Sequence, residues 1–262
     1  RVKRMIKLAA SDLDGTLLNE KSFISKETIE IIKSSKKAGI RWVAATGRSY
    51  KTASRLLEEA GICCDYVLLN GAEFRENDGT LIFQKSIPDE SVKRIIAMLL
   101  SEKTDFELNT DAGDFSTDCD FCDTARPMPS EKELLDGKRK VQKIFIFSMK
   151  SEKLAYIKES VADMQEITLT SSASWNLEIT AREADKGSML KQVTDYYGIK
   201  KEEVIVFGDG ENDRPMFQTF LHSRAMGNAK EELKQMAEKV IETNVEHGVA
   251  KEIMRLLEEN GQ

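Results

Sequence analysis

A short apolar run, 6–11, ends in two aspartates, Asp12 and Asp14, which are separated by one residue and followed by a glycine. An apolar run of this length beside a glycine turn is typical of a buried strand in a parallel sheet. Carboxylates that follow such a strand lie at its carboxyl end, where open α/β sheets bind their ligands. Aspartate and glycine are also common in solvated turns, so the pair alone leaves both interpretations open.

The first third of the chain repeats this pattern. Strands are expected at 6–11, 40–45 and 66–69, with helices at 25–37 and 49–60 between them. Each helix begins at a serine and is followed by a glycine, the residues that commonly start and stop helices. Thr46 and Asn70 follow the second and third strands. Strand–helix–strand repeats of this length require a parallel sheet with right-handed crossovers.

The last third of the chain returns to the same alternation. Helices are expected at 186–197, from 230 and at 249–259, and strands at 203–207 and 225–229. The strand at 203–207 runs into Gly208-Asp209-Gly210-Glu211-Asn212-Asp213, so it too ends in carboxylates. The two outer thirds of the chain therefore predict one α/β domain.

The middle of the chain lacks this regular alternation. Helices are expected at 92–101 and 154–164, and strands at 143–149, 166–171 and 175–180. From Asn109 to Lys140 the residues are mostly polar, include two prolines and show little periodicity, so we expect one long loop region there. We interpret 82–184 as an α+β domain inserted into a core formed by 1–81 and 185–262.

The charge balance argues against a strongly basic surface. The 39 Lys and Arg residues and 45 Asp and Glu residues give a formal net charge of −6, which does not favour binding of nucleic acid over the whole surface. No apolar stretch reaches the roughly 20 residues that a membrane-spanning helix needs. The apolar run before Asp12 is too short for a signal peptide. We therefore expect a cytoplasmic monomer or small homo-oligomer with no nucleic-acid or membrane partner.

The four cysteines form two close pairs, Cys63 with Cys64 and Cys119 with Cys122. The second pair has the spacing of half a zinc site or of a redox pair. The first pair does not supply the other half, and the two histidines lie far along the chain. Adjacent cysteines are also poor candidates for a structural disulfide, and a cytosolic protein meets a reducing environment. We favour four reduced thiols, with a zinc or redox site as the alternative.

The carboxyl ends of parallel strands share one edge of a sheet, so residues far apart in the sequence are expected in one crevice. The expected set is Asp12, Asp14, Thr46, Lys186, Asp209 and Asp213. Several carboxylates this close repel one another unless a cation lies among them. Oxygen ligands favour a hard ion, and Mg²⁺ is the natural choice for an ion that also holds a phosphate.

These segments resemble the motifs of a known enzyme superfamily. In order, Asp12-Leu13-Asp14-Gly15-Thr16, Thr46-Gly47-Arg48, Lys186-Gly187 and Gly208 to Asp213 resemble the four motifs of the haloacid dehalogenase superfamily. Asn70-Gly71-Ala72, Ala225-Met226-Gly227-Asn228-Ala229 and Gly248-Val249-Ala250 resemble its Cof-type phosphatase branch. The resemblance implies a Rossmann-like, doubly wound parallel sheet with an α+β cap of type IIB between the second and third motifs. It also implies a magnesium-dependent phosphatase.

The resemblance assigns roles to the motif residues. Asp12 is expected to be the nucleophile that forms an aspartyl-phosphate, and Asp14 the general acid and base. Lys186 is expected to offset the negative charge of the site. Phosphate binding is expected from Leu13, Thr46, Gly47, Lys186, Asn212 and Arg48, and metal binding from Asp12, Asp209, Asp213 and the backbone carbonyl of Asp14. Asp213 is expected to act on the metal from behind the direct ligands or through a water molecule, and Asn212 has the alternative role of steadying the loop of the nucleophile. Arg48 has two possible roles: it contacts the substrate, or it simply forms an ion pair with a carboxylate.

The expected partner is a small phosphate ester, either a sugar phosphate or a phosphorylated cofactor. The cap is expected to close over the site and to set specificity, but nothing in 82–184 identifies the substrate. A phosphosugar mutase would use the same aspartate nucleophile, and a catalytically weak phospho-ligand-binding protein would keep the same residues. Both remain as alternatives to the phosphatase.

Overall fold

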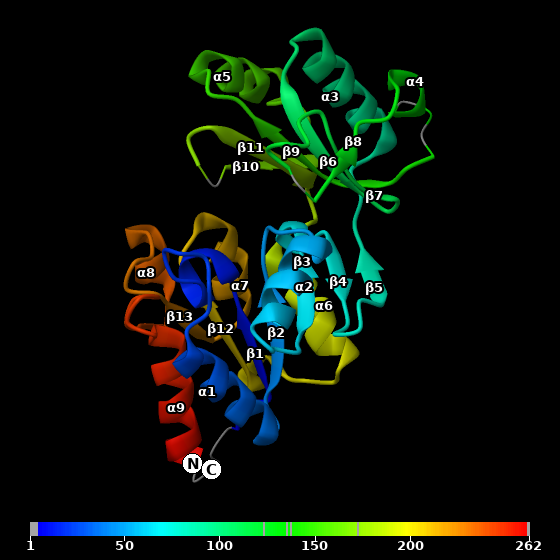
Figure 1. Cartoon of the computed structure of the whole chain (residues 1–262). Helices are drawn as coiled ribbons and strands as arrows, with labels where there is room; N and C mark the ends of the chain where they lie inside the picture. Colours follow the sequence, from blue (N-terminus) through cyan, green and yellow to red (C-terminus); the bar gives the residue numbers. More distant parts are fainter. Residues whose placement is uncertain (1–4, 123, 135, 137, 172, 261–262) are drawn as a thin grey trace. The chain divides into compact units, whose positions relative to one another are not determined.

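The structure is a computed structural model that describes residues 5–122, 124–134, 136, 138–171 and 173–260. The chain divides into two compact units (Figure 1). The core unit holds the described residues of Arg1–Phe83 and Asp185–Gln262, and the insert unit is Gln84–Ala184. Within the described residues, no helix has both the length and the apolar character needed to cross a membrane.

The core unit is built on a sheet with the strand order β14-β13-β12-β1-β2-β3-β4-β5. Its strands are β1 (Leu8–Ser11), β2 (Arg41–Ala45), β3 (Asp65–Leu68), β4 (Glu73–Arg75), β5 (Leu81–Gln84), β12 (Val204–Gly208), β13 (His222–Ala225) and β14 (Lys239–Val240). Strands β14 to β3 pair in parallel, and β4 pairs antiparallel with β3. Strand β1 is central, with β2 on one side and β12 on the other. The predicted doubly wound parallel sheet is confirmed.

Helices lie on both faces of this sheet (Figure 1). They are α1 (Lys26–Lys37), α2 (Tyr50–Glu59), α6 (Lys186–Tyr196), α7 (Arg214–Thr219), α8 (Glu231–Met236) and α9 (Gly248–Asn260), with short turns η1 (Leu13–Leu17), η2 (Leu69–Gly71), η3 (Lys201–Glu203) and η4 (Glu211–Asp213). Helix α1 starts as predicted at Ser25, whose hydroxyl accepts a hydrogen bond from Thr28 N at 3.1 Å. Helices α2, α6 and α9 also lie where the sequence predicts helices.

The strands β1 and β12 are buried along their whole length. A strand covered on both faces cannot alternate polar and apolar side chains, which is why both read as continuous apolar runs. Polar side chains can follow only where the chain leaves the sheet. In both strands that point is the carboxyl end.

One predicted strand of the core unit was wrong in its position. The strand expected at 225–229 is β13, which ends at Ala225, and the residues after it turn out of the sheet. Met226 N donates to Gly208 O at 3.1 Å and Ala229 N to Met226 O at 2.9 Å, which closes the turn. Strands β4, β5 and β14 and helix α7 were not predicted, because each is short and carries little periodicity.

The insert unit is a six-stranded sheet in the order β10-β11-β9-β6-β7-β8. Its strands are β6 (Asp105–Thr110), β7 (Gly113–Ser116), β8 (Arg126–Pro127), β9 (Val141–Phe147), β10 (Ile167–Thr170) and β11 (Asn176–Ala181), and its helices are α3 (Asp89–Ser101), α4 (Glu131–Leu134) and α5 (Ser151–Ser160). Apolar residues of α3 and α5 pack with those of β6, β9 and β11 into one buried core. Both helices therefore cover the same face of the sheet (Figure 1).

The long loop expected from Asn109 to Lys140 was wrong. Strand β7 forms a hairpin with β6, and β8 and α4 follow. Gly113 makes the hairpin turn possible at φ 106°, in the left-handed region that favours glycine. The hairpin escaped prediction because its side chains are mostly polar. Within the same segment, Cys119 and Cys122 are free thiols, and burial, with Glu107 close by, raises the pKa of Cys122 to about 12.

Candidate active site

Three carboxylates gather at the carboxyl edge of the core sheet. Asp12 follows β1 and Asp209 follows β12, and the two strands are neighbours. Asp213 lies at the end of η4. One oxygen of each carboxylate lies within 4.8 Å of the others, and no other such group occurs among the residues that the structure describes. The pairing of β1 with β12 therefore brings Asp12 close to Asp209, although the two residues lie far apart in the sequence.

Lys186, the first residue of α6, places its ammonium between two of these carboxylates. Its Nζ donates to Asp12 Oδ1 and to Asp213 Oδ1, both at 2.7 Å, and the side chain is fully buried. Burial would lower the pKa of Lys186, but the two carboxylates raise it above its ordinary value. The lysine is therefore a fixed positive charge rather than a proton donor.

The approach of α6 depends on Gly187. A Cβ at this position would lie 2.2 Å from the backbone oxygen of Pro215 in α7, far inside any real contact distance. Glycine at this position lets α6 and α7 pack closely enough for Lys186 to reach the carboxylates.

Asp213 is held by the loop that follows β12. Its Oδ2 accepts hydrogen bonds from the backbone N of Asp209 and of Gly210, both at 3.0 Å. Gly208 makes room for it, because a Cβ there would lie 2.5 Å from Asp213 Cβ. With both oxygens engaged, this carboxylate has one orientation.

The cluster carries more negative than positive charge. Burial raises the pKa of Asp12 well above its ordinary value, and Asp213 and Asp209 add to this, although Lys186 acts in the opposite direction. Burial and the charge of Asp213 raise the pKa of Asp209 to about 6. Oxygen ligands this close and this short of positive charge fit a hard divalent cation such as Mg²⁺.

The turn after β1 packs closely against Asp209. Gly15 has φ 80°, and a Cβ there would lie 2.3 Å from Asp209 Oδ2. Thr16 Oγ1 donates to Asp209 Oδ1 at 2.9 Å. This contact of Thr16 was not predicted, although the position of Thr16 in the Asp-Leu-Asp-Gly-Thr segment could have indicated it.

Asp14 lies apart from this cluster. Arg48 holds its carboxylate by two hydrogen bonds, from Nε at 2.8 Å and from Nη2 at 2.6 Å, and the Asp14 side chain is 55% exposed. The hydrogen bonds to Asp14 are also the main reason that the pKa of Arg48 is raised. Of the two roles considered for Arg48, the structure shows the ion pair. The carboxylate of Asp14 does not join the three gathered ones, and the role predicted for Asp14 at the metal belongs to its backbone carbonyl and not to this side chain.

The turns after β2 and β3 meet beside the cluster. Thr46 is fully buried, and its hydroxyl accepts a hydrogen bond from Arg48 N at 3.2 Å. A Cβ on Gly47 would lie 3.0 Å from Asn70 Oδ1. Asn212 Nδ2 donates to that same oxygen at 3.1 Å. Asn70 thus links the third strand end to the loop after β12, a role that its position after a predicted strand hinted at.

A further asparagine braces the Asp12 turn from the outside. Asn228 Nδ2 donates to Gly15 O at 2.8 Å, and Asn228 Oδ1 accepts from Asn244 N at 3.0 Å. Asn244 Nδ2 in turn donates to Leu18 O at 2.8 Å. Asn228 belongs to one of the segments that resemble the Cof-type branch, but its role as a brace was not predicted.

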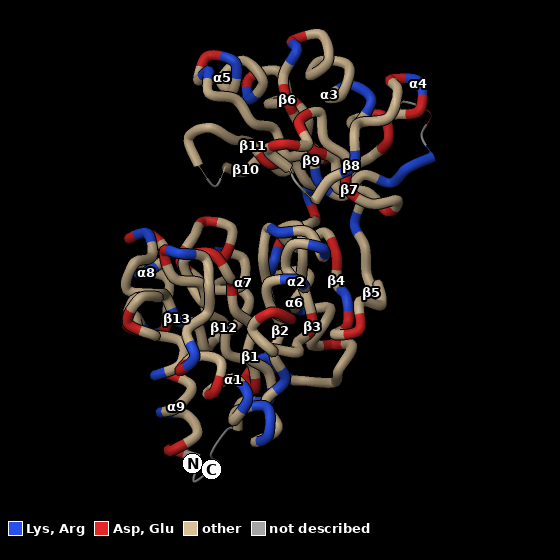
Figure 2. Tube along the Cα trace, in the orientation of Figure 1, with Lys and Arg blue, Asp and Glu red and all other residues tan. Residues whose placement is uncertain are grey.

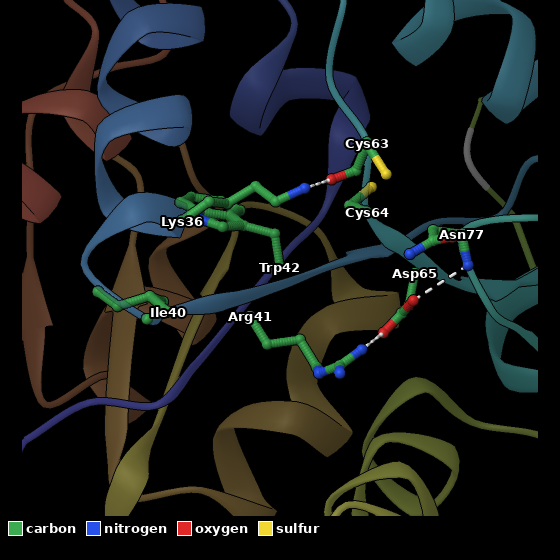
Figure 3. A pocket seen from close by; sticks show the side chains of 9 residues that line it. Lys36, Ile40, Arg41, Trp42, Cys63, Cys64, Asp65 and Asn77 are labelled. Carbon is green, nitrogen blue, oxygen red and sulfur yellow. Dashed lines mark hydrogen bonds and ion pairs between the residues drawn. The ribbon is translucent and has the colours of Figure 1, made fainter.

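A pocket of about 300 Å³ lies at the opposite, amino-terminal edge of β2 and β3 (Figure 3). Its carboxylate, Asp65, already accepts hydrogen bonds from Arg41 Nη1 at 2.7 Å, Tyr197 Oη at 3.0 Å and Asn77 N at 3.1 Å. Cys63 and Cys64 also line it and are free thiols. Because Asp65 is fully engaged in structural contacts, this pocket is not the candidate active site.

Comparisons with known proteins assign the chain to a family. The family model for haloacid dehalogenase-like hydrolases matches residues 9–253. The chain belongs to this family. The predicted superfamily and the predicted hydrolase class are confirmed.

Individual relatives cover nearly the whole chain. The chain is 31% identical to the 5-amino-6-(5-phospho-D-ribitylamino)uracil phosphatase YwtE of Bacillus subtilis, over 96% of this chain and 98% of the relative. A solved haloacid dehalogenase-like hydrolase from B. subtilis superposes with a TM-score of 0.83 at 29% identity, covering 96% of this chain and all of that one. The subclass IIB sugar phosphatase BT4131 superposes with a TM-score of 0.80 at 25% identity, covering 95% and 98%.

Proposed function

We propose that this haloacid dehalogenase-like hydrolase is a magnesium-dependent phosphatase of small phosphate monoesters, sugar phosphates or phosphorylated cofactors. The observation that carries the proposal is the buried group of Asp12, Asp209 and Asp213 around Lys186. Its excess negative charge suits a cation, and a cation beside a carboxylate nucleophile suits phosphoryl transfer. Bound among these carboxylates, Mg²⁺ would supply positive charge to the phosphoryl oxygens.

In the proposed reaction, Asp12 attacks the phosphorus atom and the bond to the leaving oxygen breaks. Asp14 gives its proton to that oxygen. Asp14 then takes a proton from water, which attacks the aspartyl-phosphate and releases inorganic phosphate and free Asp12. A carboxylate nucleophile needs no general base for the first attack.

The phosphoryl oxygens are proposed to bind to groups of the motif residues. These are the backbone N–H groups of Leu13 and Gly47, the Thr46 hydroxyl, the Lys186 ammonium and the Asn212 amide. Lys186 is held at 2.7 Å from Asp12, so the positive charge is in place before the ester binds. Such preorganised donors stabilise charge without reorganisation during the reaction.

Arg48 is proposed to change partners during the cycle. It now holds Asp14 with the two-pronged geometry that arginine also uses for phosphate. An incoming phosphate would compete with Asp14 for the Arg48 guanidinium. Once released from Arg48, the Asp14 carboxylate would be able to take up the proton that it later gives to the leaving oxygen. Both roles considered for Arg48 would then be used in turn.

The test is phosphate release from a panel of phosphate esters with Mg²⁺ and after chelation with EDTA, by the wild type and Asp12→Asn. The panel includes sugar phosphates and the ester named for YwtE. We expect release by the wild type with Mg²⁺ only, and none by the variant. Undiminished release by Asp12→Asn, or release that survives EDTA, would overturn the proposal, and an isomerised phosphosugar in place of free phosphate would indicate a mutase.

A further inference from the structure

Three consecutive residues after β3 have a left-handed backbone, and we call 69–71 the left-handed turn. Leu69, Asn70 and Gly71 have φ values of 52°, 57° and 95°. Glycine adopts this region freely and asparagine tolerates it, but a leucine in it is an outlier. Leu69 and Asn70 are also buried, so their surroundings hold the backbone in this conformation. Strained backbones cluster at functional sites, and the contacts of this turn indicate a function.

The left-handed turn holds the loop after β2 through its backbone. Leu69 N donates to Arg48 O and Asn70 N donates to Thr46 O, both at 3.1 Å. The peptide bond between Thr46 and Gly47 is planar and trans, so the Gly47 N–H points away from the Thr46 carbonyl. The hydrogen bond from Asn70 N therefore fixes the direction of the Gly47 N–H, which is one of the proposed phosphate donors.

The side chain of Asn70 fixes a second donor. Its Oδ1 accepts a hydrogen bond from Asn212 Nδ2 at 3.1 Å. That nitrogen carries two N–H groups, so the bond to Asn70 also sets the direction of the other one. If the Asn212 amide turned over, it would present its oxygen, which repels a phosphoryl oxygen. The contact with Asn70 thus decides whether Asn212 presents a donor.

Gly71 brings the left-handed turn against the start of α6. A Cβ on Gly71 would lie 2.2 Å from Asp185 O and 2.8 Å from Lys186 N, so only glycine permits this approach. The turn therefore touches three separate segments: the loop after β2, the loop after β12, and the residues that begin α6. Each of these segments carries a residue that is proposed to bind the phosphoryl group.

We propose that Asn70 is a positioning residue of the phosphate site. Its backbone N–H aligns the Gly47 N–H, and its side chain aligns the Asn212 amide, without itself touching the ester. The inference rests on the proposed function and adds to it the residue that keeps two donors in place before the phosphoryl group arrives. Donors that are aligned in advance stabilise charge without reorganisation.

Two substitutions at Asn70 separate the backbone from the side chain. Asn70→Gly removes the side chain and keeps a residue that adopts φ 57° readily, whereas Asn70→Ala removes the side chain and resists that φ. With p-nitrophenyl phosphate and Mg²⁺, we expect kcat/KM to fall about tenfold in Asn70→Gly, the effect of one hydrogen bond to a charged group. Asn70→Ala should lose more. Wild-type kcat/KM in Asn70→Gly, or equal losses in the two variants, would overturn the proposal.

A double-mutant cycle tests whether the side chain acts through Asn212. Asn212→Ala should lower kcat/KM about as much as Asn70→Gly does. The double variant should then stay within about twofold of Asn212→Ala, because the effects of residues that act through one contact do not add. A general structural disturbance would instead multiply the two losses, and that result would overturn the proposal.

The matched control is Lys103→Gly, which makes the same kind of exchange at an exposed left-handed residue, φ 48°, just after α3. This variant should keep the wild-type kcat/KM. An equal loss in Lys103→Gly and Asn70→Gly would overturn the proposal, because the effect would then belong to any left-handed residue.

A second readout does not need catalysis. Calorimetric titration with inorganic phosphate in the presence of Mg²⁺ should give a Kd that is about tenfold higher in Asn70→Gly than in the wild type, and unchanged in Lys103→Gly. This pattern without any ester hydrolysis would support the role of Asn70 and contradict the proposed function. Equal phosphate affinity of wild type and Asn70→Gly, or no phosphate binding by the wild type, would overturn the role of Asn70, and hydrolysis by the wild type would still support the phosphatase.

Discussion

Both units of the molecule bury a lysine against a carboxylate at 2.7 Å, and the surroundings of the two pairs differ. In the core unit Lys186 meets Asp12 and Asp213 where the chain leaves the parallel sheet. In the insert unit Lys143 meets Glu178 in the middle of an antiparallel sheet. Similar pairs therefore need not serve similar purposes.

The difference lies in what stands beside each pair. Next to Lys186, Asp209 brings a third carboxylate, and the pairs lie where the chain leaves the parallel sheet. Next to Lys143 the backbone is committed to strand pairing, and aromatic rings take the remaining room. The first setting suits bond cleavage with a cation, and the second is a buried pair packed against aromatic rings. Acidic and basic residues are otherwise interspersed over both units (Figure 2).

The largest effect should come from Asp12→Asn, which removes the nucleophile and keeps the shape of the side chain. We expect kcat to fall by at least about 10³-fold, as for other residues that act directly in covalent catalysis, measured as phosphate release with Mg²⁺. The control is Asp195→Asn, an exposed aspartate of α6 paired with Lys191, which should retain wild-type activity. Comparable losses in the two variants would contradict the role of Asp12.

The two buried lysines offer the next contrast. Lys186→Met and Lys143→Met should each lower the free energy of unfolding by about 3–5 kcal/mol, because each leaves buried carboxylate charge without its partner. Urea unfolding with and without Mg²⁺ separates them. With Mg²⁺ added to every protein, we expect the deficit of Lys186→Met relative to the wild type to shrink, because the ion offsets the charge of the three crowded carboxylates. The deficit of Lys143→Met relative to the wild type should stay the same, because this variant leaves those carboxylates as they are in the wild type. If Mg²⁺ reduced the loss of unfolding free energy in both variants, or in neither, the two buried lysine–carboxylate pairs would not differ as we propose.

Asp209→Asn should affect stability in a pH-dependent way. Burial and Asp213 raise the pKa of Asp209 from 3.8 to about 6. A raised folded-state pKa means that the stabilising contribution is complete below about pH 4 and is lost as the pH rises through 6. With EDTA present, the variant should therefore be more stable than the wild type by about 1–3 kcal/mol at pH 7.5, with a smaller difference at pH 4.5.

The same substitution should abolish the rise in melting temperature that we expect Mg²⁺ to give the wild type, since stabilisation by a ligand requires binding to the folded state. A wild-type response to Mg²⁺ in Asp209→Asn would place the ion elsewhere. Wild-type stability at both pH values would show that the crowding of the carboxylates has no energetic cost.

The smallest effect on stability should come from Arg48→Lys, because its ion pair with Asp14 is partly exposed and such pairs contribute less than about 1 kcal/mol. Lysine cannot form the two-pronged contact, so we expect kcat to fall about three- to tenfold through poorer positioning of Asp14. Arg55→Lys, in an exposed pair with Glu59, is the matched control. Equal kcat values for the two variants would indicate that the Asp14–Arg48 pair has no part in turnover.

The sequence predicted the core unit better than the insert unit. Parallel strands end at one edge, so Asp12, Thr46 and Asp209 could be grouped from strand ends alone. The contacts made by the loop after β12 could not be predicted, because the hydrogen bond of Asn212 with Asn70 depends on how two turns approach each other. Pairing with a carboxylate was one of two roles left open for Arg48, and only the geometry shows that this carboxylate is Asp14.

In the insert unit the pairing of strands determines which side chains come into contact. Lys143 and Glu178 lie on strands β9 and β11, whose register is set by the whole sheet and not by local pattern. The aromatic cluster joins Phe121 from a loop to Phe147 of β9. The spacing of residues in the sequence does not predict such contacts, which is why the Lys143–Glu178 pair and the aromatic cluster were not predicted while the strand-end carboxylates were.

The most direct test of the account is to find the phosphoryl group on Asp12. Wild type and Asp14→Asn are mixed with p-nitrophenyl phosphate and Mg²⁺, stopped with acid, and their peptides analysed by mass spectrometry. We predict a phosphorylated peptide whose modified residue is Asp12, in greater amount in Asp14→Asn, because that variant lacks the base for the second step. Turnover of the ester with Asp12 unmodified in both proteins would contradict the account.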